Sequence, residues 1–226
     1  MPFYVPPEQM MKDRADYARK GIARGRSLVA CSVSDGIVLV AENQFRTLYK
    51  ISEIYDRIAF AGVGKYNEFE MLRVAGVRQA DLKGYSFARE DVNARALANA
   101  YGQTLGQVFT HEMKPYEVEI LVAQVGETVD DDELYHILYD GTVMDEEGST
   151  VLGGQAEEIA EAMESRFSTD MDSSAAIRLG AAVLAGPDTL LSADQLEVAL
   201  LDRTRARRAF RRIKGGELVS ILDASG

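Results

Sequence analysis

The chain has 226 residues, of which 46% are hydrophobic, and a formal net charge of −11. One domain of this length can bury a large core, and the excess of negative charge argues against a general affinity for nucleic acid. No apolar run approaches the roughly 20 residues that a membrane helix needs, so no contact with a membrane is expected.

The first seven residues, MPFYVPP, combine three prolines with bulky apolar side chains. Because proline blocks regular secondary structure, we expect residues 1–7 to form a flexible or extended segment. The same stretch lacks the basic-then-apolar order of a signal peptide.

Residues 8–24 then have the pattern of an amphipathic helix. Its apolar side chains recur at helical spacing on one face, at Met11, Ala15, Ala18 and Ile22.

Two β-hairpins follow this helix. The segments LVACSV (28–33) and IVLVA (37–41) are apolar at every position, which is typical of strands that are covered on both faces. The Asp35-Gly36 pair between them supplies a tight turn. A second pair of strands is expected within residues 48–61, with its turn at Asp56.

The rest of the chain is a series of helices and strands in blocks. We expect helices over 66–80, 90–113, 155–167, 172–185 and 215–223, and strands over 116–125, 134–140, 196–202 and 207–213, with one more short strand that ends at Gly153-Gly154. Strands that are apolar on both faces need cover on both sides, and two blocks of paired helices can supply it. The sequence therefore predicts an α+β fold, a four-layer αββα sandwich, as a single domain over residues 8–226.

Basic residues gather in two clusters despite the negative net charge. The first spans residues 12–26, and the second, residues 203–214, holds seven Lys and Arg residues. The second cluster could be a patch for nucleic acid. Its flanking sequence reads as strand, turn and strand, however, and we interpret it as a hairpin that faces solvent or another subunit.

The sequence has no complete signature of a nucleotide, metal or serine-hydrolase site. The run from Gly62 to Lys65 departs from a phosphate-binding loop at Ala59 and at Tyr66. The two histidines stand 25 residues apart, and the acidic run 130–133 lacks the alternation of an EF-hand loop. No Gly-x-Ser-x-Gly elbow is present. We therefore expect no cofactor and no metal.

The only cysteine, Cys31, lies within an apolar strand pattern. It cannot form an intrachain disulfide, which fits a chain that works in a reducing cytoplasm. We expect it to behave as a small buried hydrophobic residue and not as a nucleophile.

The order of a carboxylate at Glu42, a lysine at Lys50 and a Gly-x-Gly turn that ends at Gly64 resembles the proteasome family, whose members are N-terminal-nucleophile hydrolases or their inactive relatives. In the active members a free N-terminal threonine attacks the peptide carbonyl, and a carboxylate and a lysine orient it. Counted by the family's spacing from Glu42, the nucleophile would stand at Arg26, which has no hydroxyl. Ser27 could substitute only after cleavage of the preceding bond.

The resemblance to α-type subunits, above all those of actinobacteria, extends over about 215 residues in order and spacing. It rests on ADYARKGIARG (15–25), LYKISEIYDRIAFAGVGKYNEFE (48–70), VNARALANAYGQTLGQVF (92–109), KPYEVEILVAQVG (114–126), LYHILYDGTV (134–143), VLGG (151–154) and RRAFRRI (207–213). It implies a non-catalytic subunit of the 20S core that forms heptameric outer rings on the β subunits. Such rings gate substrate entry and dock ATPase activators for intracellular protein degradation.

The resemblance also implies site residues in this chain. The gate would be the N-terminal segment Pro2, Phe3, Tyr4, Val5, Pro6 and Pro7. The C-terminal carboxylate of an activator would dock at Lys50, beside Gly64 and with Asp16 of the opening helix nearby. The tail lacks the tyrosine-aspartate-arginine element that archaeal and eukaryotic α subunits carry there, so the gate is expected to be ordered differently.

Two alternatives stay open on the sequence alone. One is an active hydrolase that is cleaved before Ser27, which intact mass would reveal through the loss of 26 residues. The other is an unrelated binding module of mixed α/β fold, which would not assemble into rings.

Overall fold

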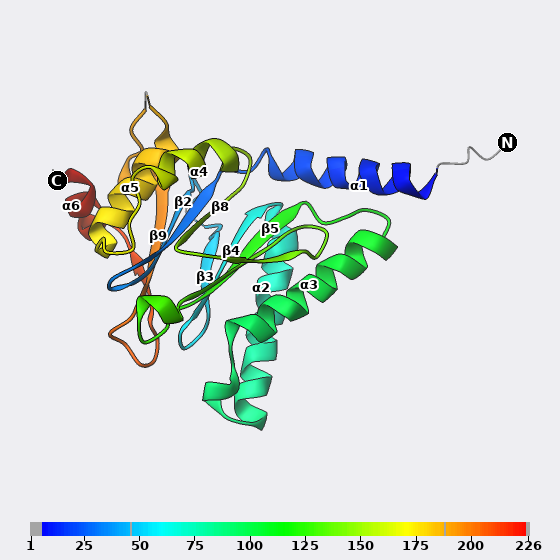
Figure 1. The fold of residues 1–226 in the computed structure, drawn as a ribbon, viewed down its shortest axis with the longest axis horizontal. Coiled ribbons are helices and arrows are strands. Elements are labelled where there is room, and N and C mark those ends of the chain that lie inside the picture. Colours follow the sequence, from blue (N-terminus) through cyan, green and yellow to red (C-terminus); the bar gives the residue numbers. More distant parts are fainter. Residues whose placement is uncertain (1–5, 46, 188, 225–226) are drawn as a thin grey trace.

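The structure is a computed structural model that describes residues 6–45, 47–187 and 189–224. Two antiparallel sheets of five strands each face one another within these residues (Figure 1). The first sheet has the order β10 (Phe210–Ile213), β9 (Leu196–Asp202), β2 (Gly36–Glu42), β1 (Leu28–Val33) and β8 (Ser149–Leu152). The second sheet has the order β3 (Ile51–Tyr55), β4 (Ile58–Gly64), β5 (Val118–Gln124), β6 (Glu133–Ile137) and β7 (Val143–Glu146).

Helices cover the outer face of each sheet. α2 (Tyr66–Ser86) and α3 (Ala94–His111) pack on the second sheet. α4 (Ala156–Glu164), α5 (Ser173–Ala185) and α6 (Gly216–Asp223) pack on the first. Three short 3-10 helices lie in connections, at Arg89–Asp91, Val129–Asp131 and Ala193–Gln195. The predicted four-layer αββα arrangement is confirmed.

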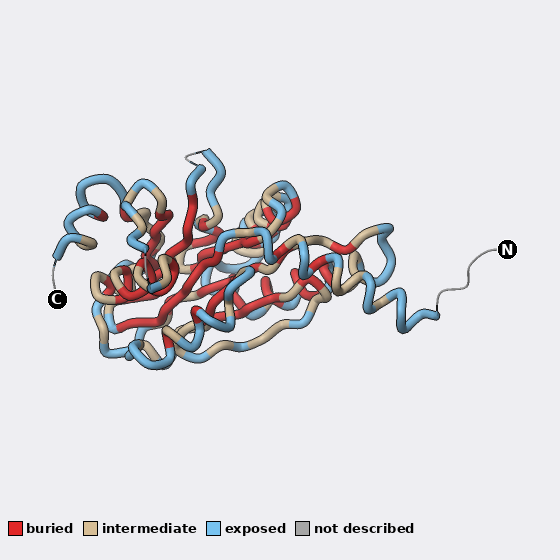
Figure 2. Tube along the Cα trace, turned by 90° about the horizontal axis from the view of Figure 1, so that it is seen from above, coloured by how far each residue is buried: buried red, intermediate tan, exposed pale blue. Residues whose placement is uncertain are grey.

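The burial pattern follows from the layers. Every residue of β1 and of β2 is buried, because one face of each strand meets the second sheet and the other face meets α4 and α5. Figure 2 shows this buried interior as a continuous band of strands with exposed loops and helix surfaces around it. This is the physical reason for the uninterrupted apolar runs in the sequence.

α1 (Pro7–Ile22) projects from the body of the molecule, with the N-terminus at its far end (Figure 1). Pro7 is its first residue and not part of an extended tail, since the fixed φ of proline suits the first helical position. Arg14 anchors the helix by donating to the carbonyl oxygens of Phe109 at 2.7 Å and Glu112 at 2.7 Å, near the end of α3. The remaining expected gate residues, Pro2 to Val5, lie outside the described residues.

Some element boundaries differ from those expected. α2 continues beyond residue 80 to Ser86, and Gly84 within this extension lets the helix lie close to Tyr55. α3 begins after Asn93, whose side chain accepts from the backbone N–H of Ala96 at 2.9 Å, and not at residue 90. Asp172 caps α5 by accepting from the backbone N–H of Ala175 at 2.7 Å. None of the described helices is long and apolar enough to span a membrane.

Candidate functional site

Three residues that the sequence singles out meet at one end of the sandwich. Lys50, just before β3, donates from Nζ to the carbonyl oxygen of Arg26 at 2.7 Å. The Arg26 guanidinium lies 3.1 Å from Oε1 of Glu42, at the end of β2. The positions of the nucleophile, carboxylate and lysine thus form one cluster, as the resemblance implies, and an arginine occupies the first of them.

The charge balance of the cluster is set by burial. Desolvation lowers the pKa of Lys50 from 10.5 to about 8, although the nearby carboxylates of Glu197 and Glu42 favour the proton. The Arg26 guanidinium adds to the lowering. The ammonium therefore lies in a place where more negative charge would stabilise it.

Glu197 in β9 organises the backbone on which Lys50 stands. It is 8% exposed and accepts from the backbone N–H groups of Lys50 at 2.8 Å and Ile51 at 3.0 Å. It also accepts from Asn43 Nδ2 at 2.7 Å and Arg212 Nη1 at 2.8 Å. Sequence reasoning missed this residue, whose only signal is a single charge inside the apolar strand LEVALL.

A cavity of about 240 Å³ lies beside Glu197, between the segment after β2 and the strands β9 and β10. The guanidinium of Arg212 lies 4.0 Å from the ring centroid of Tyr49, which closes one side of the cavity. Phe45 also lines it and is 67% exposed. Charged and aromatic groups next to Lys50 thus form an accessible surface.

Gly64, the last residue of β4, is needed for internal packing. Its φ is +97°, and a Cβ there would lie 2.0 Å from the carbonyl oxygen of Glu117. This close approach between β4 and the start of β5 requires glycine whether or not a peptide docks nearby. The expected role of Gly64 in docking stays a prediction.

Asp16 lies on α1 and is paired with Arg19 on the same helix at 3.5 Å. The charged groups that influence Lys50 come from Glu197, Glu42 and Arg26. Among the described residues of one chain, therefore, Asp16 makes no hydrogen bond or ion pair with Lys50. The expected proximity of the two residues stays a prediction.

Ser27 is buried inside the chain. It is 6% exposed, its carbonyl oxygen accepts from the N–H of Glu42 at 3.2 Å, and its hydroxyl lies against Gly153. Only cleavage of the bond between Arg26 and Ser27 would turn its amide nitrogen into the free amine that an N-terminal nucleophile uses as its base.

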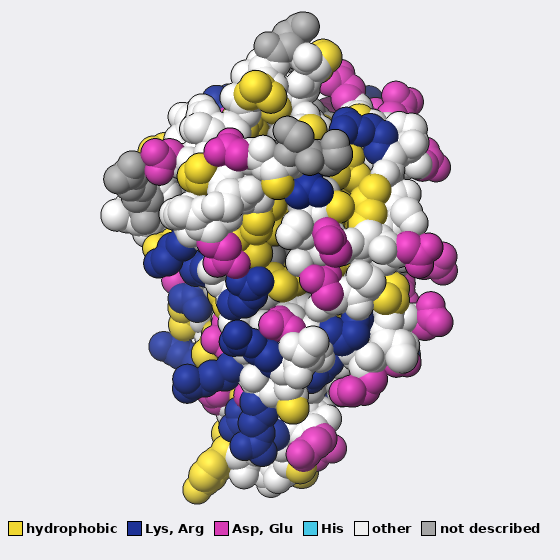
Figure 3. Space-filling view, turned by 90° about the vertical axis from the view of Figure 1, so that its left-hand side faces the viewer, with side chains coloured by type: hydrophobic (Ala, Val, Ile, Leu, Met, Phe, Trp, Pro, Cys, Tyr) yellow, Lys and Arg dark blue, Asp and Glu magenta, His cyan; other side chains and the backbone are white. Residues whose placement is uncertain are grey.

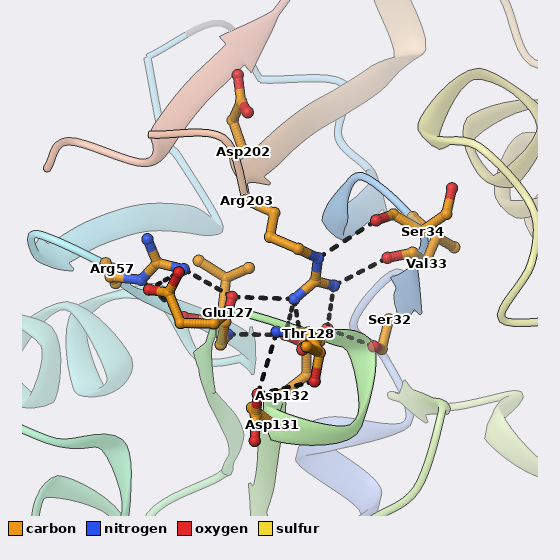
Figure 4. Close-up of polar contacts among 12 residues, drawn as sticks. Ser32, Val33, Ser34, Arg57, Glu127, Thr128, Asp131, Asp132, Asp202 and Arg203 are labelled. Atoms are coloured by element: carbon orange, nitrogen blue, oxygen red, sulfur yellow. Dashed lines mark hydrogen bonds and ion pairs between the residues drawn. The ribbon is translucent and has the colours of Figure 1, made fainter. Parts of the chain in front are cut away.

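The basic cluster 203–214 contains the most deeply embedded ion pair of the fold (Figure 4). Arg203 donates to both carboxylate oxygens of Asp132, at 2.7 and 2.8 Å, and the Asp132 side chain is 2% exposed. Arg203 also donates to the carbonyl oxygens of Val33 and Thr128, and Ser32 donates to Asp132. This arginine joins the β1–β2 turn to the β5–β6 connection.

The described residues give less support to a metal site or to a reactive cysteine. They contain no group of three or more His, Cys, Asp or Glu side chains that is placed to hold a metal ion. Burial raises the pKa of Cys31 to about 12, so its thiol stays protonated. His136 is buried between Glu119 and Glu146, at 3.5 and 3.6 Å.

Comparison with known proteins agrees with this geometry. The family model described as "Proteasome subunit" matches residues 22–200. "Proteasome subunit alpha" of Sanguibacter keddieii is 62% identical over 98% of this chain and 89% of the relative. The proteins of the same name from Kineococcus radiotolerans and Thermomonospora curvata are 55% and 56% identical, over 100% and 98% of this chain and 99% and 97% of the relatives. The chain belongs to the proteasome subunit family.

Proposed function

We propose that this chain is the non-catalytic α subunit of a 20S proteasome core in the cytoplasm. The observation that carries the proposal is the cluster at Lys50, where an internal Arg26 takes the nucleophile's place and its carbonyl oxygen accepts the lysine's hydrogen bond. The high identity to proteins named "Proteasome subunit alpha" supports the same assignment. The chain acts through assembly and has no catalytic residues of its own.

The assembly is a heptameric ring of this chain stacked on rings of β subunits. Residues 1–7 form the gate, and residues 8–226 form the single domain that carries it. α1 supports this arrangement because it projects from the body, with its first residue Pro7 at the outer end (Figure 1). Copies around one axis bring their apolar N-terminal residues together, which favours a closed gate. Ordering these residues costs conformational entropy, and this cost keeps the open and closed forms close in free energy.

The activator docks at Lys50 through a C-terminal carboxylate. A carboxylate there makes a charge-assisted contact with the Lys50 ammonium. Burial has removed much of the water that would otherwise stabilise this positive charge. Gly64 offers its backbone on the adjoining strand end, where the backbone N–H of Gly62 donates to the carbonyl oxygen of Lys50 at 2.9 Å, and Asp16 of α1 is the acidic residue expected near the lysine. No cofactor or metal takes part.

Lys50→Ala tests the docking site. It should lower degradation of an unfolded protein by the ATPase-stimulated particle at least tenfold, since truncating one partner of a buried charge pair costs about 2–5 kcal/mol. Ring assembly should be unchanged. Lys12→Ala, at an exposed lysine, is the control. Full stimulation of the Lys50→Ala particle would rule out this docking site.

Removing residues 2–7 tests the gate. The deletion should raise hydrolysis of a short peptide by the particle without activator, because the barrier at the pore is gone. Equal basal hydrolysis with and without the segment would contradict the gate. Intact mass of the wild-type particle separates the alternative, since an active hydrolase would lose 26 residues whereas the proposed subunit stays at 24.8 kDa apart from its initiator methionine.

A further inference from the structure

The two edges of the sandwich carry opposite charge. One edge is formed by β3 and β10, which the side chain of Arg212 connects by donating to the carbonyl oxygen of Ile51 at 2.6 Å. The other edge is formed by β7 and β8, which follow one another through a short turn. In each sheet these strands are hydrogen-bonded to a neighbour on one side only. Both edges are therefore open surfaces of the described chain.

The β3–β10 edge is basic. Residues 203–214 hold seven Lys and Arg residues and no acidic residue. Arg203 and Arg212 are bound internally, to Asp132 and Glu197, whereas Arg207 and Arg208 are exposed and make no ion pair within the described residues. Arg208 is the only described non-glycine residue with a positive φ, at 51°. The loop thus presents two exposed guanidinium groups, which influence the carboxylate of Asp56, and in the case of Arg208 that of Glu53, without a close ion pair.

The β7–β8 edge is acidic. Residues 140–165 hold eight Asp and Glu residues and no Lys or Arg. On α4, the spacing of Glu157, Glu161 and Glu164 places the three carboxylates on one stripe. All three are exposed, and none makes an ion pair within the described part of the chain. Figure 3 shows Lys and Arg side chains concentrated over the lower left of one face of the molecule, with Asp and Glu side chains at its right-hand margin and also interspersed across its centre.

The acidic edge is hollowed into a groove of about 790 Å³ between α4 and the strands β7 and β8. Its lining includes the apolar residues Val151, Met163 and Phe167 and the carboxylates of α4. His136 also lines it and is buried, with its Nε2 atom 3.5 Å from a carboxylate oxygen of Glu119 and its Nδ1 atom 3.6 Å from Glu146. A groove with an apolar floor and a rim of exposed carboxylates on α4 is suited to a basic loop.

We propose that this groove receives the 203–209 loop of a second copy, so that Arg207 and Arg208 pair with Glu157 and Glu161. The inference rests on the proposed ring and names the surfaces that build it. A contact between two different surfaces of the same chain is heterologous, and repeating it around an axis closes a ring. An acidic edge opposite a basic edge also fixes the direction of assembly, because two like edges repel.

Charge reversal of each edge tests the proposal in the full chain co-expressed with the β subunit of the same genome. One variant carries Arg207→Glu and Arg208→Glu, a second carries Glu157→Arg and Glu161→Arg, and a third carries all four changes. The charge-conserving changes Arg207→Lys and Arg208→Lys are the control. Native mass spectrometry measures the fraction of chains in rings, and circular dichroism checks that each variant is folded.

Each single-edge reversal should lower the ring fraction at least tenfold, whereas the control and the fourfold variant should assemble like the wild type. Wild-type rings together with intact rings in the single-edge variants would overturn the proposed contact and leave the proposed function standing. Loss of rings that the fourfold variant does not restore would also overturn the pairing. Absence of rings in the wild type would instead refute the proposed function.

Discussion

Lys50→Met tests whether desolvation of the Lys50 ammonium lowers the stability of the folded chain. Burial lowers the pKa of Lys50 from 10.5 to about 8. At about 1.4 kcal/mol per pKa unit, holding the proton in the folded chain at pH 7 costs about 3 kcal/mol. Methionine removes that cost and gives up the hydrogen bond to Arg26, which is worth about 1 kcal/mol. We expect the variant to be about 2 kcal/mol more stable at neutral pH.

The pH dependence gives the sign of the effect. Below pH 8 the lysine is protonated in both the folded and the unfolded chain, so the cost is fully present. As the pH rises from about 8 to 10.5, the folded chain releases its proton first and the cost disappears. Urea unfolding at pH 7 and pH 10 should therefore show a stability difference between variant and wild type that shrinks at the higher pH.

A control and a refuting result complete this experiment. Lys12→Met replaces an exposed lysine of α1 and should change stability little at either pH. If Lys50→Met were less stable than the wild type at pH 7, or if its advantage did not shrink at pH 10, the ammonium would not carry the inferred desolvation cost.

The same pKa predicts how docking depends on pH. A group with a pKa of about 8 is about 90% protonated at pH 7 and about 10% at pH 9. Because only the ammonium pairs with a carboxylate, the affinity of wild-type rings for the C-terminal peptide of the ATPase should fall about tenfold over this range. Fluorescence anisotropy of a labelled peptide measures it, and an affinity independent of pH would argue that Lys50 does not bind the carboxylate.

Three further variants test the packing that holds the site. Asp132→Ala leaves Arg203 buried without its partner and should lower the free energy of unfolding by about 3–5 kcal/mol in urea titrations. Gly64→Ala should lower the thermal midpoint of the chain, because its Cβ would collide with the carbonyl of Glu117. Asn93→Ala should cost about 1 kcal/mol through loss of the α3 cap, as measured by chemical unfolding.

The sequence predicted the layers of the fold because each layer leaves a local pattern. The apolar runs around Asp35-Gly36 mark strands with cover on both faces, and the helical stripes between them mark that cover. Helix ends were less predictable where propensity and capping compete. Asn93 and Asp91 can both cap a helix, and only the folded chain shows that Asp91 belongs to the preceding 3-10 turn.

The site was predictable only in part, for a related reason. Glu42 and Lys50 follow from spacing along the chain, and the structure brings them together with Arg26. Glu197 and the Asp132–Arg203 pair depend on contacts across 147 and 71 positions of sequence, respectively. No local pattern records such pairs, because each partner alone looks like an ordinary charged residue. The fold alone makes them neighbours.

The presence of an arginine at position 26, where active relatives have the nucleophile, accounts for the lowered pKa of Lys50. In the active relatives that the chain resembles, the lysine and the carboxylate serve a hydroxyl. Here the guanidinium of Arg26 takes the carboxylate of Glu42 at 3.1 Å, and the lysine receives only a neutral carbonyl oxygen. Desolvation then outweighs the remaining attraction and lowers the lysine's pKa. Under the proposed function, the carboxylate of an activator adds to the negative charge that Glu197 and Glu42 already place beside this lysine, so the same desolvation favours the proposed docking.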